Sequence, residues 1–220
     1  MAAAGDAADQ VIRVAVVDDD DLVRSGLVAI IGLEGDIEVV GEGADGADVP
    51  SLVARSSPDV VLMDVRMPHI DGIAATAALA SREGGPAVVV LTTFENDSYV
   101  RDALLAGARA FVLKRATPEQ LLMTVRTVAR TEALVFPEAI RSVAVPHAST
   151  RAPRWVGRLT AREREVMAEM ARGSTNSEIA ESLFISLETV KSHVRSLLAK
   201  SGARHRTELV VRAYESGMLS

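Results

Sequence analysis

Five short apolar runs alternate with five helix-period segments between residues 11 and 130, and this alternation constrains the fold more than any other feature of the chain. The runs are rich in valine, which is typical of parallel strands buried on both faces of a sheet. The predicted strands cover residues 11–17, 37–40, 60–63, 87–91 and 110–113. The predicted helices cover residues 22–33, 47–55, 73–82, 97–106 and 118–130. Strict alternation predicts an α/β domain with a five-stranded, parallel, doubly wound sheet.

Polar residues stand where four of these runs end. They are Asp19, Asp64, Thr92 and Lys114. Because the carboxyl ends of parallel strands meet at one edge of a sheet, we expect the four side chains to converge on one site. A single aspartate in such a loop is more often a helix cap or a turn residue. We predict that simpler role for Asp20, Asp21 and Asp71.

The converging carboxylates predict a cation site. Asp18 and Asp19 follow the first run, and Asp64 follows the third. Carboxylates about 5 Å apart repel by roughly 3 kcal/mol at an effective dielectric near ~20, so a cation must hold them together. Oxygen ligands without histidine or cysteine nearby favour Mg²⁺. With Lys114 as a fixed charge and Thr92 as a hydroxyl donor, the set matches a phosphoryl-transfer site with a carboxylate nucleophile.

Four segments of this region match a known family. They are VVDD at 16–19, PDVVLMDVRMPHIDG at 58–72, VVVLTTF at 88–94 and GARAFVLK at 107–114. On these segments, residues 11–131 resemble the receiver domain of two-component response regulators, which has a flavodoxin-like fold.

The resemblance implies a role for each residue of the site. Asp64 would accept a phosphoryl group from a sensor histidine kinase, with Lys114 pairing with the phosphoryl oxygens and Thr92 bonding one of them. Phe111 would be the aromatic switch residue. The implied Mg²⁺ ligands are Asp18, Asp19, Asp64 and the backbone carbonyl of Arg66.

The net charge of −6 hides a division of the chain. Residues 1–140 carry a charge of −11, whereas residues 141–220 carry +5 and contain no aspartate. A short helix is predicted over residues 137–144, and the segment after it has two prolines and no stable period. We therefore predict a linker over residues 132–157 and a separate basic domain over residues 158–220.

The basic domain has the signals of a small all-α domain with four helices. Capping boxes pair Thr160 with Glu163 and Thr175 with Glu178, and Ser186 is a third N-cap. The helices predicted over 176–183 and 187–200 are separated by only three residues, the short turn of a helix-turn-helix. The polar face of the second of these helices consists of Thr189, Lys191, Ser192, His193 and Arg195. Such a face is compatible with either solvent or DNA, and the basic charge favours DNA.

The segment LTAREREVMAEMARGSTNSEIAESLFISLETVKSHVRSLLAKSGARHRTEL at 159–209 resembles the LuxR-type helix-turn-helix along its whole length. The resemblance implies that the helix from residue 187 is the recognition helix, and that a last helix over about 206–216 forms a dimer contact. The residues implied to face base edges or nearby phosphates are Lys191, Ser192 and Arg195. The implied phosphate contacts are Thr175, Asn176, Thr189 and Arg206.

Together these patterns predict a response regulator of the NarL/LuxR type, in which phosphorylation of Asp64 favours dimerisation and promoter binding. We expect no enzymatic activity beyond autophosphorylation from small phosphodonors and self-dephosphorylation. No apolar run approaches the roughly 18 residues of a membrane span, which predicts a cytoplasmic protein without a membrane partner. The expected partners are a histidine kinase, double-stranded DNA and, on activation, a second copy of the chain.

Two alternatives remain open. Residues 19–23 fit the DxDx(T/V) pattern of haloacid-dehalogenase phosphatases, with Asp19 as nucleophile and Asp21 as general acid. Those enzymes need a further acidic pair downstream for the metal, and this alternative leaves Asp64 without a role. A regulator that works without phosphorylation is the third possibility, and the completeness of the phosphorylation site disfavours it.

Overall fold

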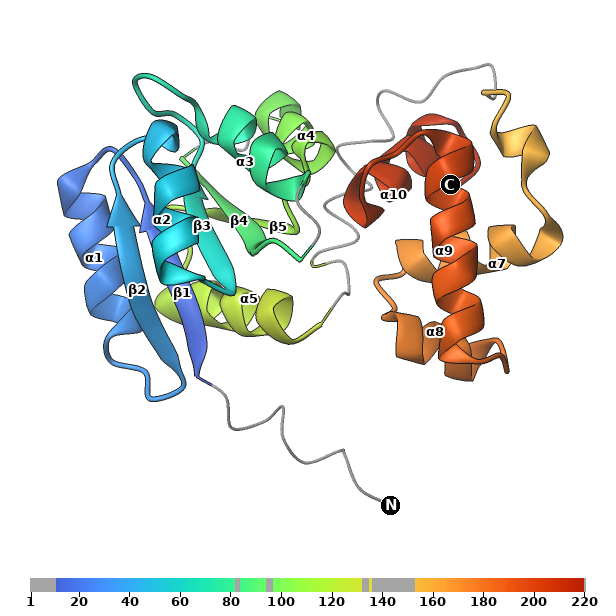
Figure 1. Ribbon diagram of the computed structural model, residues 1–220, viewed down its shortest axis with the longest axis horizontal. Coiled ribbons are helices and arrows are strands. Elements are labelled where there is room, and N and C mark those ends of the chain that lie inside the picture. The colour runs from blue at the N-terminus through green and yellow to red at the C-terminus, as the bar shows by residue number, and fades with distance from the viewer. Residues whose placement is uncertain (1–10, 82–83, 94–96, 132–134, 136–152, 220) are drawn as a thin grey trace. The chain divides into compact units, whose positions relative to one another are not determined.

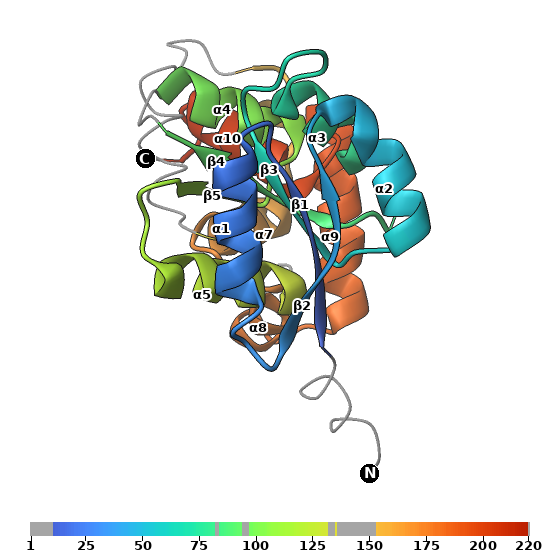
Figure 2. The same cartoon turned by 90° about the vertical axis from the view of Figure 1, so that its left-hand side faces the viewer.

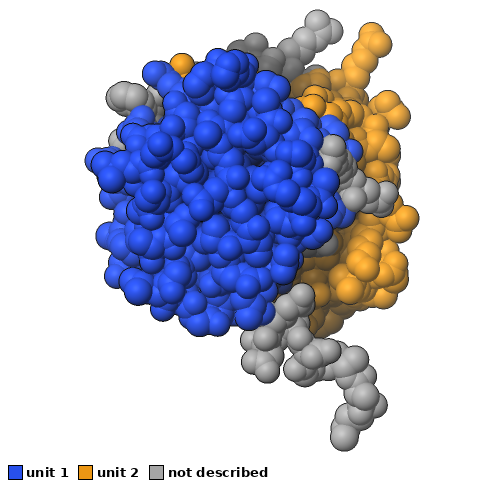
Figure 3. Space-filling view, turned by 60° about the vertical axis from the view of Figure 1, so that its left-hand side comes forward, with its two compact units in different colours: residues 1–95, 110–130 blue, residues 96–109, 131–220 orange. Residues whose placement is uncertain are grey.

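The structure, a computed structural model, describes residues 11–81, 84–93, 97–131, 135 and 153–219. Its contacts divide the chain into two compact units, residues 1–95 with 110–130 and residues 96–109 with 131–220 (Figure 3). Each unit is described separately below.

The first unit is built on a five-stranded sheet in which every strand pair is parallel (Figure 1). The strands are β1 (Ile12–Val17), β2 (Ile37–Gly43), β3 (Val60–Asp64), β4 (Ala87–Thr92) and β5 (Ala110–Leu113). Their order is β2-β1-β3-β4-β5, so the chain reverses its direction of winding between β1 and β3. The predicted doubly wound sheet is confirmed, and its point of reversal is where ligands bind in such folds.

Helices cover both faces of this sheet (Figure 2). On one face lie α1 (Asp21–Ile31) and α5 (Pro118–Arg130), and on the other lie α2 (Val49–Ser56) and α3 (Gly72–Ala80). The central strands are fully buried between the two layers, as their valine-rich sequences predict. Asp20 and Asp71 cap α1 and α3 as expected, because the Asp20 carboxylate accepts from two amides of the first turn and the Asp71 carboxylate from one. Asp21 is the first residue of α1.

β2 is longer than the sequence predicts, because it continues through Gly41 and Gly43. A Cβ atom at position 41 would lie 2.4 Å from Cδ1 of Leu52 in α2, so a larger residue there would require the end of the Leu52 side chain to move. β2 therefore includes two glycines, although glycine normally weakens a strand. The next segment differs as well, because Gly46–Asp48 form the 3-10 helix η1 before α2 starts.

The second unit contains α4 (Asp97–Ala106), although its sequence lies between β4 and β5. The predicted 11–131 domain includes this helix, whereas its contacts group it with the C-terminal helices. The other elements are η3 (Val156–Arg158), α7 (Ala161–Ala171), α8 (Asn176–Ser182), α9 (Leu187–Ser201) and α10 (Arg206–Glu215). The short helix predicted over residues 137–144 lies outside the described residues.

Local signals define the starts of the C-terminal helices. Both predicted capping boxes form, and Ser186 caps α9 by accepting from the Thr189 amide. Only three residues separate Ser182, the end of α8, from Ser186, the cap of α9, so the helix-turn-helix is confirmed.

Glu163 has a second role that the sequence did not indicate. Its side chain is buried, and besides the capping box it accepts hydrogen bonds from Ser196 Oγ at 2.7 Å and Lys200 Nζ at 2.6 Å. Burial alone would raise the pKa of Glu163, but Lys200, Ser196 and Thr160 lower it to about 2. This buried ion pair connects α7 to α9 in the core of the second unit.

Candidate functional site

Three charged residues meet at the carboxyl edge of the sheet. The Lys114 Nζ lies 2.7 Å from Asp18 Oδ2 and 2.8 Å from Asp64 Oδ1, so one ammonium bridges two carboxylates. Asp18 is fully buried, and 5 % of Asp64 is exposed. Asp18 follows β1, Asp64 ends β3 and Lys114 follows β5. The parallel pairs β1–β3, β3–β4 and β4–β5 bring these strand ends to one edge of the sheet.

Burial changes the titration of this cluster. It raises the pKa of Asp64, although the ion pair with Lys114 opposes that change. For Lys114, burial alone would lower the pKa, but the two carboxylates outweigh it and raise the pKa above its ordinary value. The lysine therefore remains charged beside Asp18 and Asp64.

The donor set fits a divalent cation. Asp18, Asp19 and Asp64 each offer a carboxylate oxygen, and these atoms lie within 4.8 Å of one another. All three are hard oxygen ligands, which suits Mg²⁺. The Arg66 amide donates to Asp64 Oδ2 at 3.0 Å, so the residue expected to add a backbone carbonyl lies beside the cluster.

Thr92 and Phe111 lie on the two strands beyond Asp64. Thr92 is buried at the end of β4, where its carbonyl accepts from the Lys114 amide at 2.8 Å. Phe111 is half-buried on β5 and is paired in register with Val90. All the predicted residues of the phosphorylation site thus belong to one unit and to the same edge or its adjoining strands.

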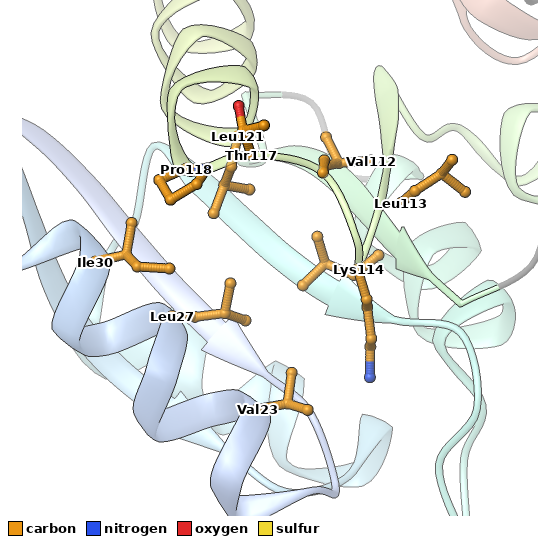
Figure 4. A pocket seen from close by; sticks show the side chains of 11 residues that line it. Val23, Leu27, Ile30, Val112, Leu113, Lys114, Thr117, Pro118 and Leu121 are labelled. Carbon is orange, nitrogen blue, oxygen red and sulfur yellow. The ribbon is translucent and has the colours of Figure 1, made fainter.

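A small apolar pocket lies on the other side of Lys114, between α1 and α5 (Figure 4). Val23 and Leu27 line it from α1, and Pro118 and Leu121 line it from α5. Its volume is about 70 Å³. This is far below the roughly 300 Å³ of small-molecule sites, so the chemistry of this unit is better placed at the acidic cluster.

Arg24 supports the acidic cluster, and sequence reasoning did not identify it. Its Nη1 donates to the Asp18 carbonyl at 2.7 Å, and its Nε lies 3.4 Å from Glu42 on β2. The guanidinium therefore ties the loop after β1 to the neighbouring strand. The available signal was an arginine one helical turn beyond a run of four aspartates.

In the second unit, α9 presents the predicted polar face to solvent. Thr189, Lys191, Ser192 and Arg195 are all exposed. The Lys191 Nζ lies 2.9 Å from Glu188, and Arg195 Nε donates to the Lys191 carbonyl at 3.4 Å. These contacts are local and exposed, so phosphates can compete for both cations.

The other predicted DNA contacts form a separate polar group. Arg206 at the start of α10 donates to Asn176 Oδ1 at 2.9 Å and to the Ser174 carbonyl. Thr175 accepts from the Glu178 amide at 3.1 Å as the cap of α8. The Arg206–Asn176 bond therefore connects the start of α10 to the start of α8.

Comparison with known proteins identifies two domains, and the first of them includes α4. The family model described as response regulator receiver domain matches residues 14–126, which is more than half of the chain. The chain belongs to the response regulator family. A second model, described as bacterial regulatory proteins, luxR family, matches residues 158–213. The response regulator is thus of the NarL/LuxR type, a two-component transcriptional regulator with a DNA-binding domain and not an enzyme. The phosphatase alternative is excluded by this membership.

Relatives of this response regulator match it over nearly their full length. Transcriptional regulatory protein YxjL of Bacillus subtilis is 40% identical over 216 residues, which cover 94% of this chain and 97% of the relative. Transcriptional regulatory protein LiaR of the same organism is 35% identical over 219 residues, covering 95% and 100%.

Solved structures show the same architecture. Response regulator ChrA of a heme-sensing two-component system is 34% identical, with a TM-score of 0.50 and coverage of 95% of this chain and 99% of that one. The receiver domain of a NarL from Mycobacterium tuberculosis is 37% identical, with a TM-score of 0.52 and coverage of 55% and 97%. Among the described residues of this response regulator, no helix has the length and apolarity needed to cross a bilayer.

Proposed function

We propose that phosphorylation of Asp64 controls DNA binding by this response regulator. A phosphohistidine of a sensor kinase transfers its phosphoryl group to the Asp64 carboxylate, so that the P–N bond breaks and an aspartyl phosphate forms. The protein works where its DNA target is, in the cytoplasm.

One observation carries the proposal, the bridge that Lys114 forms between Asp18 and Asp64. An ammonium within 2.8 Å of the nucleophilic carboxylate is already placed to pair with an incoming phosphoryl oxygen. Thr92, buried at the next strand end, supplies a hydroxyl for another oxygen. The site thus offers donors from two strand ends beside a single nucleophile.

Asp18, Asp19, Asp64 and the Arg66 carbonyl would hold Mg²⁺. When bound, the ion supplies the positive charge that lets an anionic phosphoryl group approach a carboxylate. The protein itself provides the rigid frame, since Asp18 is fully buried and held by Lys114.

Thr92 and Phe111 transmit the effect of Asp64 phosphorylation to the surface of the protein. A phosphoryl group on Asp64 draws the Thr92 hydroxyl toward it, and Phe111 turns into the space that this vacates. These two packings form a two-state element, and phosphorylation favours the inward one. The changed surface, together with α10, favours a homodimer.

The dimer binds DNA through α9. Lys191, Ser192 and Arg195 occupy the exposed face of this helix and face base edges or nearby phosphates in the major groove, and Thr189 on the same face contacts phosphate. Thr175, Asn176 and Arg206 contact phosphates. The two recognition helices of a dimer reach inverted half-sites about one duplex turn apart.

The test measures three quantities on the full chain with acetyl phosphate or beryllofluoride in the presence of Mg²⁺. Wild-type protein should gain one phosphate by intact mass, self-associate more tightly in sedimentation, and bind duplex DNA more tightly. Asp64→Asn should lose all three responses, and Thr92→Ala should keep the phosphate but lose much of the other two.

The DNA-binding face has its own test. Lys191→Ala and Arg195→Ala should each weaken binding by roughly 1–3 kcal/mol if they read bases, and should reduce the salt dependence.

One result would contradict the control of DNA binding by phosphorylation. If beryllofluoride leaves the DNA affinity of wild-type protein unchanged, the protein is a phosphorylation-independent regulator.

A further inference from the structure

Asp45, between β2 and η1, binds the loop that carries the phosphorylation site. Its Oδ2 accepts from the His69 amide at 2.9 Å and lies 3.1 Å from His69 Nδ1. Its Oδ1 accepts from the Ile70 amide at 3.1 Å and from the Ala47 amide at 2.9 Å. One nearly buried carboxylate therefore joins two loops that are 24 residues apart in the sequence.

The close approach of the two loops depends on Gly46. Its amide donates to the Ile70 carbonyl at 3.2 Å, in the direction opposite to the bonds that Asp45 accepts. A Cβ atom at position 46 would lie 2.4 Å from the same carbonyl oxygen. The contact is thus a reciprocal one between backbones, and a side chain at position 46 would separate them.

The clamped loop runs from Asp64 to Gly72. Its two ends are held together, because the Gly72 amide donates to the Val65 carbonyl at 3.0 Å. Near its start, the Arg66 amide donates to Asp64 Oδ2 at 3.0 Å. The path of the loop therefore sets both the orientation of the Asp64 carboxylate and the place of the Arg66 carbonyl. Asp45 holds the middle of this path, and within the described contacts it touches none of the expected metal ligands.

We propose that Asp45 is a positioning residue for phosphoryl transfer, which fixes the Asp64–Gly72 loop through His69 and Ile70. This inference rests on the proposed function of Asp64. Hydrogen bonds from amides to an ionised carboxylate are strong, and they lower the pKa of Asp45 to about 2, the Ala47 amide contributing most. The Asp45 carboxylate therefore stays ionised over the whole physiological range of pH.

The experiment compares Asp45→Asn with Asp48→Asn in the full chain. In Asp45→Asn an amide NH₂ replaces one oxygen and faces at least one backbone N–H donor, so at least one of the bonds that hold the His69–Ile70 backbone is lost. Asp48 is the last residue of η1, the 3-10 helix that Asp45 caps, and it accepts from the Ala44 and Asp45 amides through a single oxygen. An asparagine oxygen at position 48 can still accept both, which makes this variant the matched control.

Three readouts are needed: phosphorylation rate with acetyl phosphate, the Mg²⁺ dissociation constant by calorimetry, and hydrogen exchange of the His69 and Ile70 amides. We expect the phosphorylation rate of Asp45→Asn to be about tenfold lower than that of wild type, because a small misplacement of reacting groups lowers the rate by at least that factor. It should also bind Mg²⁺ several times more weakly and exchange faster at both amides, while Asp48→Asn stays within about twofold of wild type.

A purely structural role would lower the unfolding midpoint and leave the Mg²⁺ constant unchanged. That result, or equal phosphorylation rates in the two variants, would overturn the positioning role. Unchanged protection of the Ile70 amide would overturn it too, because the carboxylate would then not hold the loop. If wild-type protein gains no phosphate at Asp64, the proposed function fails, and the Mg²⁺ constants still decide whether Asp45 positions the loop.

Discussion

A Cβ atom added to Gly72 would lie 1.9 Å from the carbonyl oxygen of Asp64. The first residue of α3 thus presses against the backbone of the phosphorylation site, and any side chain there must displace Asp64 or the helix. The absence of a Cβ at position 72 is a condition for the geometry of the whole site.

Gly72→Ala should therefore lower the free energy of unfolding by about 1–3 kcal/mol, the usual cost of forcing an extra methyl into a packed site. It should also slow phosphorylation by acetyl phosphate. Gly26→Ala is the control, because nothing lies within 4 Å of a Cβ at that position in α1. Denaturation followed by circular dichroism should show Gly26→Ala as stable as wild type or slightly more so. Equal behaviour of the two variants would contradict the packing argument.

Lys114→Gln should destabilise the protein by about 3 kcal/mol, because it leaves the buried Asp18 carboxylate without its cationic partner. Added Mg²⁺ should restore more stability to this variant than to wild type, since a second cation can replace the ammonium. Urea denaturation with and without Mg²⁺ measures both effects. Arg55→Gln, at an exposed cation of α2, should change neither quantity. A Mg²⁺ response no larger than that of wild type would refute the bridging role of Lys114.

Glu163→Gln should lower the stability of the second unit by about 2 kcal/mol, because hydrogen bonds to charged groups are lost in a buried position. Trp155, the single tryptophan of the chain, lies in this unit and reports its unfolding by fluorescence. Glu165→Gln is the matched control, since its ion pair with Arg162 is half-exposed.

The same residue predicts a response to acid. The pKa of Glu163 is about 2 in the folded chain and 4.5 ordinarily, so its contribution is complete above pH 4.5 and is lost as the pH falls toward 2. In Glu163→Gln that loss should be smaller. A wild-type stability that falls no faster than that of the variant would show that the carboxylate is not ionised in the core.

His205 predicts a second pH window, between neutrality and mild acid. Its Nδ1 accepts from the Glu208 amide at 3.2 Å as the N-cap of α10, and this bond requires the neutral ring because a protonated Nδ1 cannot accept. Its Nε2 lies 3.2 Å from the Leu105 carbonyl, to which it can donate in either charge state. Burial lowers the pKa of His205, against the attraction of Glu208. Because the folded pKa lies below the ordinary 6.5, stability should be full above pH 6.5 and should decrease as the pH falls below it.

The measurement is denaturation followed by Trp155 fluorescence at pH 7.5 and 5.5. His205→Asn keeps an N-cap that does not titrate, so the stability of this variant should depend less on pH in that interval. His193→Asn, on α9, serves as the control and should retain the wild-type dependence. If His205→Asn and wild type lose equal stability, the cap is not the group that titrates.

Local signals were sufficient for most of the fold. The capping boxes of Thr160 and Thr175 and the caps at Asp71 and Ser186 involve residues within three positions of each other, so the sequence specifies them without tertiary information. The same holds for the strand ends at Asp64, Thr92 and Lys114, because short valine-rich runs that alternate with helix-period segments are typical of parallel strands. Parallel pairing then places the strand ends at one edge. The sequence therefore predicted which residues lie together at this edge, and it indicated the family.

Only the tertiary structure decided which of these groups touch and what supports them. The Lys114 bridge, the Asp45 clamp and the Glu163–Lys200 pair join residues between 24 and 96 positions apart, and periodicity carries no information about such distances. The close packing of Leu52 in α2 on Gly41 in β2 likewise depends on the tertiary structure. Short-range hydrogen bonds determine where the helices begin and end, whereas long-range packing and charge pairing determine which helices, strands and loops contact one another.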